Sequence, residues 1–404
     1  MIILKRLTCY SFIFIILGPA FEYFVNATES YTLDDTRVDY PLGNVIYNLY
    51  SDNTKARHAF ESYFNRMFSG RDFYVQLWNT LSVAVFSDHE KVYIGKEGWL
   101  FFKNYISNHI AREREIFKNR NLIHSNFANL QQLLDELGID LILLIPPYKT
   151  RVYPENFPDL PESLLHDSPG NAIIYSAASG KNRIHVIDIK TALLERKQDL
   201  QLYYRGDHHW TLGAGLVAND LVMDVIAAIT LSEPARRGFV LTETMSQAPE
   251  RAEFKFLQGV KPLYEHLPEV VRPWTTKPKT MGNYRHWSYN SSINPPFPGL
   301  VVLGDSFFQH YFDKESLLDL FSKTTFYNND NNVYIHGRNE HIPDGTRFIL
   351  LEIFEQNTDK LYTQAWWNDV LSLIGGPGSL TQQDSSRNFG NTYPSPGFVS
   401  GCAN

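Results

Sequence analysis

Two short segments, far apart in the 404-residue chain, carry the residue types that catalyse acyl transfer. Residues 206–210 read Gly-Asp-His-His-Trp, which puts a carboxylate, Asp207, two positions before an imidazole, His209. Residues 301–307 read Val-Val-Leu-Gly-Asp-Ser-Phe, the pattern of a buried strand that ends in a tight turn with Ser306 at its tip. A serine hydroxyl is a weak nucleophile and needs a base within hydrogen-bond reach. His209 can be that base, and Asp207 can hold the imidazole in the required tautomer.

The chemistry depends on where Ser306 stands in the fold. We expect it between a strand and a helix, and in parallel α/β sheets reactive groups collect at the carboxyl ends of strands. Exposed N–H groups at a helix start stabilise developing negative charge, so the main-chain N–H of Ser306 is one expected oxyanion donor, and its partners are not placed. We expect Trp210 to begin the helix after the Asp-His segment, with Thr211 as its cap. The interpretation requires the two segments to meet in space.

Other interpretations of the same residues stay open. A lone Gly-Asp-Ser is most often a simple turn, and His208 can be a hydrogen-bonded core residue. Tandem histidines beside an aspartate also occur in metal sites, so residues 207–209 are a zinc-site alternative, although no His-Glu-x-x-His cluster accompanies them. The chain has two cysteines, Cys9 and Cys402, so we expect no thiolate metal site and no disulfide within the domain. We expect neither a metal nor a cofactor.

The elements that must position these residues are indicated by near-continuous apolar runs, which are typical of strands buried on both faces. Helical patterns lie between the runs, and this alternation predicts a parallel sheet covered by helices on both sides. Two short strands about a Lys-Glu-Gly turn are expected at 92–102. The expected buried strands are 141–145, 184–189, 300–303 and 348–354, and the main expected helices are 121–137, 213–229 and 307–321.

The N-terminus has the pattern of a targeting segment, because Lys5 and Arg6 precede a short apolar run at 7–21. That run is shorter than the roughly 20 apolar residues of a membrane span. No clear cleavage site follows it, so a cleaved signal and an uncleaved anchor both stay open. We divide the chain into a signal peptide or membrane anchor (1–24), a linker (25–45), a main domain (46–374) with an insertion at 233–297, and a disordered tail (375–404).

Composition restricts the class of partner. The formal net charge is -7, which argues against a nucleic-acid partner because such a partner favours a basic face. Apolar residues make up 43% of the chain and aromatic residues 14%, enough for a large core and for surface rings that can stack on sugars.

Five segments occur together in an order that resembles a known family. They resemble the SGNH-hydrolase-like domain of the alginate O-acetyltransferase proteins AlgJ and AlgX, including the related DHHW proteins. The resemblance covers roughly residues 45–370. It implies a three-layer αβα fold with a central parallel sheet. The segments are Ile-Gly-Lys-Glu-Gly-Trp-Leu-Phe (94–101), Ile-Pro-Pro-Tyr-Lys-Thr-Arg-Val-Tyr-Pro-Glu (145–155), Asp-His-His-Trp (207–210), Gly-Asp-Ser-Phe (304–307) and Glu-Ile-Phe-Glu-Gln-Asn (352–357).

The resemblance also implies a function. Asp207, His209 and Ser306 correspond to the family's catalytic triad. The implied protein is a periplasmic enzyme, held at the inner membrane through its N-terminal segment, that attaches acetyl groups to an exopolysaccharide. Its implied partners are a polysaccharide acceptor and a membrane-bound O-acyltransferase that supplies the acetyl group. The oxyanion-hole asparagine of typical SGNH enzymes has no clear counterpart, and Arg338 is either a substrate contact or a solvated loop charge.

Three functions therefore compete. The first is transfer of an acetyl group to a polysaccharide, and the second is a carbohydrate acetylesterase that uses the same triad with water as the acceptor. The third is a non-catalytic polysaccharide-binding subunit. The first two differ in whether the acceptor site binds sugar and excludes water, which the sequence does not show.

Overall fold

The computed structural model describes most of the main domain. Several predicted segments lie outside the described residues: the signal or anchor at 1–24, the linker at 25–45, and the tail at 375–404 apart from Gly375. Both cysteines and Arg338 lie outside them as well. The described residues are 81, 91–157, 168–234, 240–247, 266–271, 281–282, 286–291, 295–311, 317–329 and 341–375.

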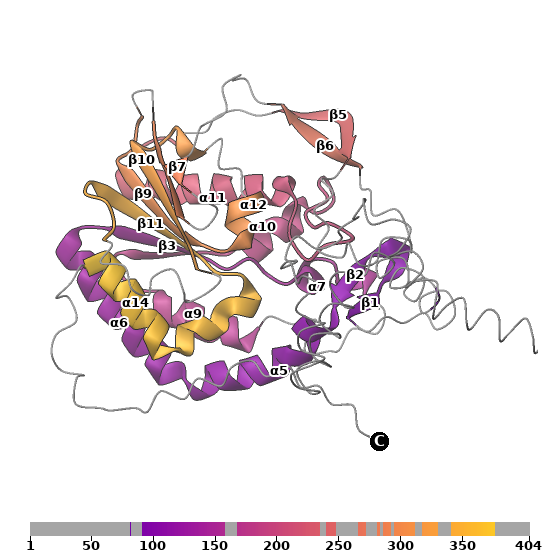
Figure 1. The fold of residues 1–404 in the computed structure, drawn as a ribbon, viewed down its shortest axis with the longest axis horizontal. Coiled ribbons are helices and arrows are strands. Elements are labelled where there is room, and N and C mark those ends of the chain that lie inside the picture. Colours follow the sequence, from indigo (N-terminus) through magenta and orange to yellow (C-terminus); the bar gives the residue numbers. More distant parts are fainter. Residues whose placement is uncertain are drawn as a thin grey trace, which may run out of the picture.

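A seven-stranded sheet forms the centre of the domain (Figure 1). Its strands are β3 (Asp140–Leu144), β4 (Ile184–Ile187), β7 (Met281–Gly282), β8 (His286–Asn290), β9 (Gly299–Gly304), β10 (Lys323–Asn328) and β11 (Thr346–Glu352). The strand order is β4-β3-β11-β9-β10-β8-β7, and neighbouring strands from β4 to β10 run parallel. β8 and β7 extend the sheet by antiparallel pairing. The carboxyl ends of β3, β9 and β11 therefore meet at one edge.

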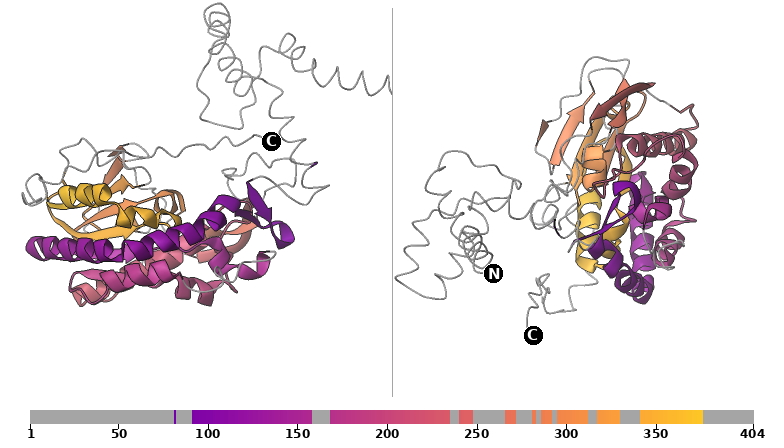
Figure 2. Two further views of the ribbon diagram at one scale, coloured as in Figure 1. Left: turned by 90° about the horizontal axis from the view of Figure 1, so that it is seen from below. Right: turned by 90° about the vertical axis from the view of Figure 1, so that its right-hand side faces the viewer.

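Helices cover both faces of the sheet, as Figures 1 and 2 show. Along β3 and β9, Ile142 and Val302 belong to the core on one face, whereas Leu141 and Val301 belong to the core on the other. Successive side chains of a strand point to opposite faces, so a continuous apolar run is what a doubly covered strand requires. The helices on the first face are α7 (Lys149–Val152), α10 (Ile189–Arg196), α11 (Leu212–Thr230) and α12 (Ser306–Tyr311), and those on the second are α5 (Lys103–Lys118), α6 (Arg120–Leu137), α9 (Pro169–Ala178) and α14 (Gln364–Gly375).

Smaller elements complete the described part of the chain. A hairpin of β1 (Val92–Ile94) and β2 (Leu100–Phe102) surrounds a short 3-10 turn at Lys96–Gly98, as expected from the Lys-Glu-Gly pattern. Two further 3-10 turns are Pro154–Asn156 and Glu355–Tyr362. β5 (Val240–Gln247) and β6 (His266–Val271) pair in a separate two-stranded sheet.

The expected αβα arrangement with a mostly parallel sheet is confirmed, and β3, β4, β9 and β11 coincide with the four apolar runs. Four details differ from the expectation. β10 was not expected, because its sequence Lys-Thr-Thr-Phe-Tyr-Asn is not an apolar run. β7 and β8, from within the stretch 233–297, pair into the central sheet. β4 ends at Ile187, before the expected strand end at 189, and Ile189 begins α10. Of the helix expected at 307–321, α12 is its described first part, and residues 312–316 lie outside the described residues.

Among the described helices, α11 has the length and apolar composition of a membrane span. Half of its most apolar stretch is buried inside the domain, where Ala218, Val222 and Ile226 belong to the core. A core helix of a globular domain passes the same test of length and composition. Packing against the sheet therefore accounts for the apolarity of α11.

Candidate functional site

Ser306 is the first residue of α12 and follows β9 at the carboxyl edge of the sheet. The preceding residue, Asp305, is fully buried. Its Oδ1 accepts a hydrogen bond of 3.0 Å from the N–H of Phe307, and its Oδ2 accepts one of 2.8 Å from the N–H of Phe354. The N–H of Asp305 itself donates to Oε2 of Glu352 at 2.9 Å. The serine turn is thus tied both to its own helix and to the neighbouring strand, β11, which limits how far Ser306 can move.

Asp207 and His209 lie in a loop whose two ends are joined by main-chain contacts. Tyr203 and Trp210 form an isolated antiparallel bridge, and the N–H of Thr211 donates to the carbonyl of Leu202 at 2.9 Å. The expected helix start at Trp210 is wrong by two residues, because α11 begins at Leu212. Thr211 does stand at the cap position, but its hydroxyl donates to the carbonyl of Gln201 at 2.6 Å and so closes the loop.

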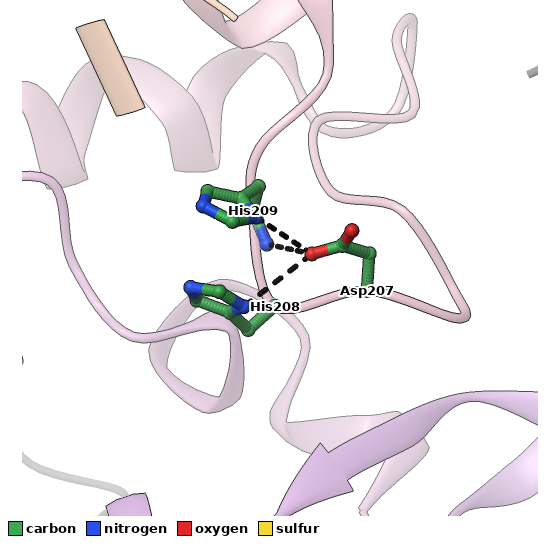
Figure 3. A group of neighbouring side chains, drawn as sticks. All are labelled: Asp207, His208 and His209. Carbon is green, nitrogen blue, oxygen red and sulfur yellow. Dashed lines mark hydrogen bonds and ion pairs between the residues drawn. The ribbon is translucent and has the colours of Figure 1, made fainter. Parts of the chain in front are cut away.

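Within this loop, one carboxylate oxygen organises the histidine (Figure 3). Oδ1 of Asp207 accepts hydrogen bonds from the main-chain N–H of His209 at 2.9 Å and from its ring Nδ1–H at 2.7 Å. The i, i+2 spacing therefore lets the carboxylate of Asp207 reach one ring nitrogen of His209, Nδ1. Both residues are buried.

The loop and the serine turn meet at a single atomic contact. Nε2 of His209 lies 2.9 Å from Oγ of Ser306. Because an ionised carboxylate can only accept, the Asp207 contact fixes the proton on Nδ1 of His209 and leaves the lone pair of Nε2 facing the hydroxyl. The structure thus brings the predicted acid, base and nucleophile together in that order.

The carboxylate of Asp207 is held in its ionised form. Burial by itself would raise the pKa of Asp207, but hydrogen bonds from His208 and His209 outweigh burial and keep this pKa well below its ordinary value. An ionised Asp207 is what the orienting role requires, since it must stabilise the positive charge of a protonated His209.

A buried lysine, Lys149, holds the main chain of the same loop by hydrogen bonds. Nζ of Lys149 donates to three main-chain carbonyls, those of Leu100 and Arg205 at 2.8 Å each and that of Asp207 at 3.0 Å. It also lies 5.0 Å from the ring centroid of Trp99, a distance typical of a cation–π contact. The sequence interpretation assigned no role to Lys149, although the residue lies in one of the segments that carried the family resemblance.

His208 lies beside His209 in an aromatic setting. Its ring centroid is 3.7 Å from that of His209, 5.3 Å from that of Tyr105 and 5.8 Å from that of Phe354. Its Nδ1 is 3.4 Å from Oδ1 of Asp207, so both tandem histidines approach one oxygen. The His208 ring and Tyr148 both line a cavity of about 20 Å³. That is room for about one water molecule.

The zinc-site alternative is weighed by the chemistry of these donors. The ligand atoms of Asp207, His208 and His209 lie within 4.8 Å of one another, as a metal site would need. However, Nδ1 of His209 is already bonded to Asp207, and Nε2 already contacts Ser306. A metal at this place would have to break one of these contacts, so the donor arrangement favours acid–base chemistry.

A buried charged network lies behind the site. Nε of Arg151 donates to Oε1 of Glu355 at 2.6 Å, and Glu355 also accepts from the N–H of Tyr148 at 2.8 Å. Nη2 of Arg112 lies 3.0 Å from Nδ1 of His109, so this nitrogen accepts from the guanidinium. Burial, and then the charge of Arg151, lower the pKa of His109. His109 and Glu355 have the spacing of metal ligands, but the two guanidinium groups bonded to them oppose a cation.

The profile described as "SGNH hydrolase-like domain, acetyltransferase AlgX" matches residues 92–312, more than half of the chain. The chain belongs to this family. The AlgX SGNH-hydrolase-like match includes both the Asp-His loop and Ser306, and it contains four of the five segments that carried the resemblance; the segment 352–357 lies beyond the matched range.

The individual proteins that the chain resembles share less than a third of its residues over the aligned region. The chain is 28% identical over 233 residues to the probable alginate O-acetylase AlgJ of Pseudomonas aeruginosa, covering 56% of each protein. It is 28% identical over 217 residues to the protein of the same description from Azotobacter vinelandii, covering 53% of this chain and 54% of that protein. The O-acetyltransferase domain of Pseudomonas putida AlgJ, a solved structure, has 18% identity and a TM-score of 0.43, over 67% of this chain and 92% of that one. The chain thus spans about half the length of the curated relatives it matches, so the activity, substrate and partners of the whole protein are proposals.

Proposed function

We propose that this protein is a periplasmic O-acetyltransferase that moves an acetyl group onto hydroxyl groups of an alginate-like or other exopolysaccharide. The observation that supports the proposal most directly is the 2.9 Å contact between Nε2 of His209 and Oγ of Ser306, with Asp207 on the opposite ring nitrogen at 2.7 Å. Membership of a family described by an acetyltransferase supports acetyl as the transferred group. Relatives described as probable alginate O-acetylases support a polysaccharide as the acceptor.

In the first half of the reaction, Oγ of Ser306 attacks the carbonyl carbon of an acetyl donor while Nε2 of His209 takes the hydroxyl proton. The negative charge forms on the former carbonyl oxygen, for which the main-chain N–H of Ser306 is the proposed donor. The bond to the leaving group then breaks, and His209 passes the proton to that group. An acetyl ester of Ser306 and the protonated leaving group result.

In the second half, a sugar hydroxyl attacks the acetyl-serine carbonyl carbon while His209 takes the hydroxyl proton. The bond to Oγ of Ser306 breaks, His209 returns the proton to Oγ, and the O-acetylated sugar leaves. Asp207 stays ionised throughout, in keeping with its depressed pKa, and stabilises the imidazolium at each step. Water in place of the sugar would give hydrolysis.

The location and the donor follow from the same proposal. The basic residues Lys5 and Arg6 before the apolar run at 7–21 fit export and a hold on the inner membrane. A membrane-bound O-acyltransferase would then deliver acetyl groups at the membrane surface. Recovery of the native protein from the cytosol after cell fractionation would contradict this location.

The decisive experiment uses an activated acetyl ester, such as p-nitrophenyl acetate, with and without oligosaccharides of alginate or another exopolysaccharide. Wild type and Ser306→Ala are compared by release of p-nitrophenol and by the mass of the sugar. Acetylated sugar that is formed by wild type and lost in Ser306→Ala supports transfer.

The other outcomes identify the competing functions. Ser306-dependent release of free acetate, with no sugar modified in any acceptor tested, indicates a carbohydrate acetylesterase. Turnover that is equal in wild type and Ser306→Ala, or absent from both, contradicts a catalytic Ser306 and favours a polysaccharide-binding subunit.

A further inference from the structure

A second hydrogen bond joins the loop that carries His209 (the base loop, residues 203–210) to α12, the helix that begins with Ser306 (the nucleophile helix). It lies beside the contact between His209 and Ser306. The indole Nε1–H of Trp210 donates to the main-chain carbonyl of Phe307 at 3.0 Å. Trp210 directly follows His209, and Phe307 directly follows Ser306. The bond therefore runs next to the His209–Ser306 contact, one residue further along in each segment.

The surroundings of this bond are buried and tightly packed. Trp210 and Phe307 both have no exposed surface. The ring centroid of Phe307 lies 5.0 Å from that of His209, 5.4 Å from that of Trp210 and 4.3 Å from that of Phe354. A buried indole N–H or carbonyl that loses its partner has no water to replace it, so the bond is costly to break.

The two bonds behave differently during the proposed reaction. The His209–Ser306 bond requires the serine hydroxyl proton, and an acetylated Ser306 has no such proton. In the acyl-enzyme, therefore, the direct contact between base and nucleophile is lost at the moment when His209 must be placed to activate the acceptor. The Trp210–Phe307 bond uses neither reacting group, so neither half of the proposed reaction removes it.

We infer that Trp210 is a positioning residue whose indole N–H keeps the base loop in register with the nucleophile helix, above all in the acyl-enzyme. This inference rests on the proposed Ser-His-Asp function. General base catalysis needs heavy atoms within about 2.6–3.2 Å, so a displacement of the loop by even about 1 Å slows proton transfer strongly.

The test compares two buried tryptophans that make the same kind of bond. Trp367 is also fully buried, and its Nε1–H donates to the carbonyl of Leu361 at 2.7 Å. It lies in α14, on the face of the sheet opposite to α11 and α12. Trp210→Phe and Trp367→Phe each keep an aromatic ring and remove one buried indole donor, so they impose a similar structural loss at two different places.

Acetyl transfer from p-nitrophenyl acetate is measured for both variants, with single-turnover kinetics to separate acylation from deacylation. We expect Trp210→Phe to lower kcat at least tenfold, with KM within twofold and deacylation slowed more than acylation. Trp367→Phe is expected to stay within twofold of wild type. If Trp210→Phe keeps kcat within twofold of wild type, or if both variants lose activity equally, the positioning role is wrong.

A second variant covers the case in which Trp210→Phe does not fold. Replacement of Trp210 by 3-benzothienylalanine, introduced by codon suppression, keeps the size of the bicyclic ring and removes only the donor. The same loss of kcat is expected, and unchanged kcat would overturn the inference. A wild-type protein without Ser306-dependent turnover would instead overturn the triad, and the role of Trp210 with it.

Discussion

The ammonium group of Lys149 and the main-chain carbonyl of Asp207 are joined by a hydrogen bond of 3.0 Å. Lys149 lies in α7, which follows β3. The acid of the proposed triad, Asp207, is therefore supported by a helix that begins at the carboxyl edge of the sheet. The same ammonium group donates to the carbonyls of Leu100, in the β1–β2 hairpin, and Arg205, in the base loop. Lys149 therefore connects the hairpin to this loop.

The first prediction concerns this lysine. Lys149→Met keeps much of the buried stem volume but removes a charged donor from three carbonyls, of which that of Arg205 still accepts from the N–H of Leu100. We expect the free energy of unfolding to fall by about 2–3 kcal/mol, because buried acceptors lose hydrogen bonds to a charged group. We also expect kcat to fall at least tenfold, since the backbone of Asp207 loses its support. Urea denaturation and steady-state kinetics measure the two effects.

A surface lysine supplies the control for this variant. The side chain of Lys118 is 72% exposed and pairs with Glu115 on the outside of α5. Lys118→Met is expected to change stability by less than about 0.5 kcal/mol and to leave kcat unchanged. Equal kinetics for Lys149→Met and wild type would show that the lysine does not position Asp207.

The second prediction separates the tandem histidines. His209 has its Nδ1 at 2.7 Å from Asp207 and its Nε2 on Ser306, whereas Nδ1 of His208 is 3.4 Å from the same carboxylate oxygen. We expect His209→Gln to lower kcat by about a thousandfold or more, because the base is lost. His208→Gln should lower kcat less than tenfold. Comparable losses in the two variants would contradict the assignment of His209 as the base.

The third prediction concerns the dependence of stability on pH. Burial, and then the charge of Arg151, lower the pKa of His109 in the folded protein from its ordinary value of 6.5. As the pH falls below about 6.5, the unfolded chain takes up a proton here that the folded protein does not, so stability falls. This contribution is intact above that pH and is lost as the pH falls through the folded pKa.

The measurement for His109 is the free energy of unfolding in urea at pH 7.5 and at pH 5.5. One proton accounts for at most about 1.4 kcal/mol per pH unit, so the wild type should lose more stability than His109→Gln by up to this slope. Parallel losses in the two proteins would mean that His109 does not contribute.

The fourth prediction concerns the glycine before the serine turn. A Cβ on Gly304 would lie 3.0 Å from Cβ of Phe308 and 3.2 Å from Oε2 of Glu352, the group that holds the N–H of Asp305. We expect Gly304→Ala to cost about 1–3 kcal/mol by overpacking and to lower kcat, because the turn that carries Ser306 must shift. Thermal unfolding and kinetics test both effects.

Gly213 is the matched control for Gly304. It lies in the first turn of α11, where the nearest atom to an added Cβ is 3.4 Å away, at ordinary contact distance. Gly213→Ala should be neutral or slightly stabilising, since alanine favours a helix more than glycine does. Activity retained by both variants would show that Ser306 tolerates displacement of its turn.

Much of the architecture was predictable because a strand buried on both faces needs apolar residues at consecutive positions. β3, β9 and β11 had to be continuously apolar, and the strand–helix alternation followed from them. β10 escaped this rule because Thr324 and Thr325 are buried in it although they are polar. β8 pairs antiparallel with β10 and lies in a stretch whose composition resembles an insertion, so no local pattern marked it.

The amino-acid sequence by itself determined which reactive groups are present: Asp207 and His209 are two residues apart, and Ser306 stands in the turn after a buried strand. Only the tertiary structure decided that these groups touch, with the Trp210–Phe307 bond and the Lys149–Asp207 bond holding them in place. The physical reason is that such contacts join residues 58 or 97 positions apart. Their formation depends on how strands and helices pack in three dimensions, and no local periodicity encodes that.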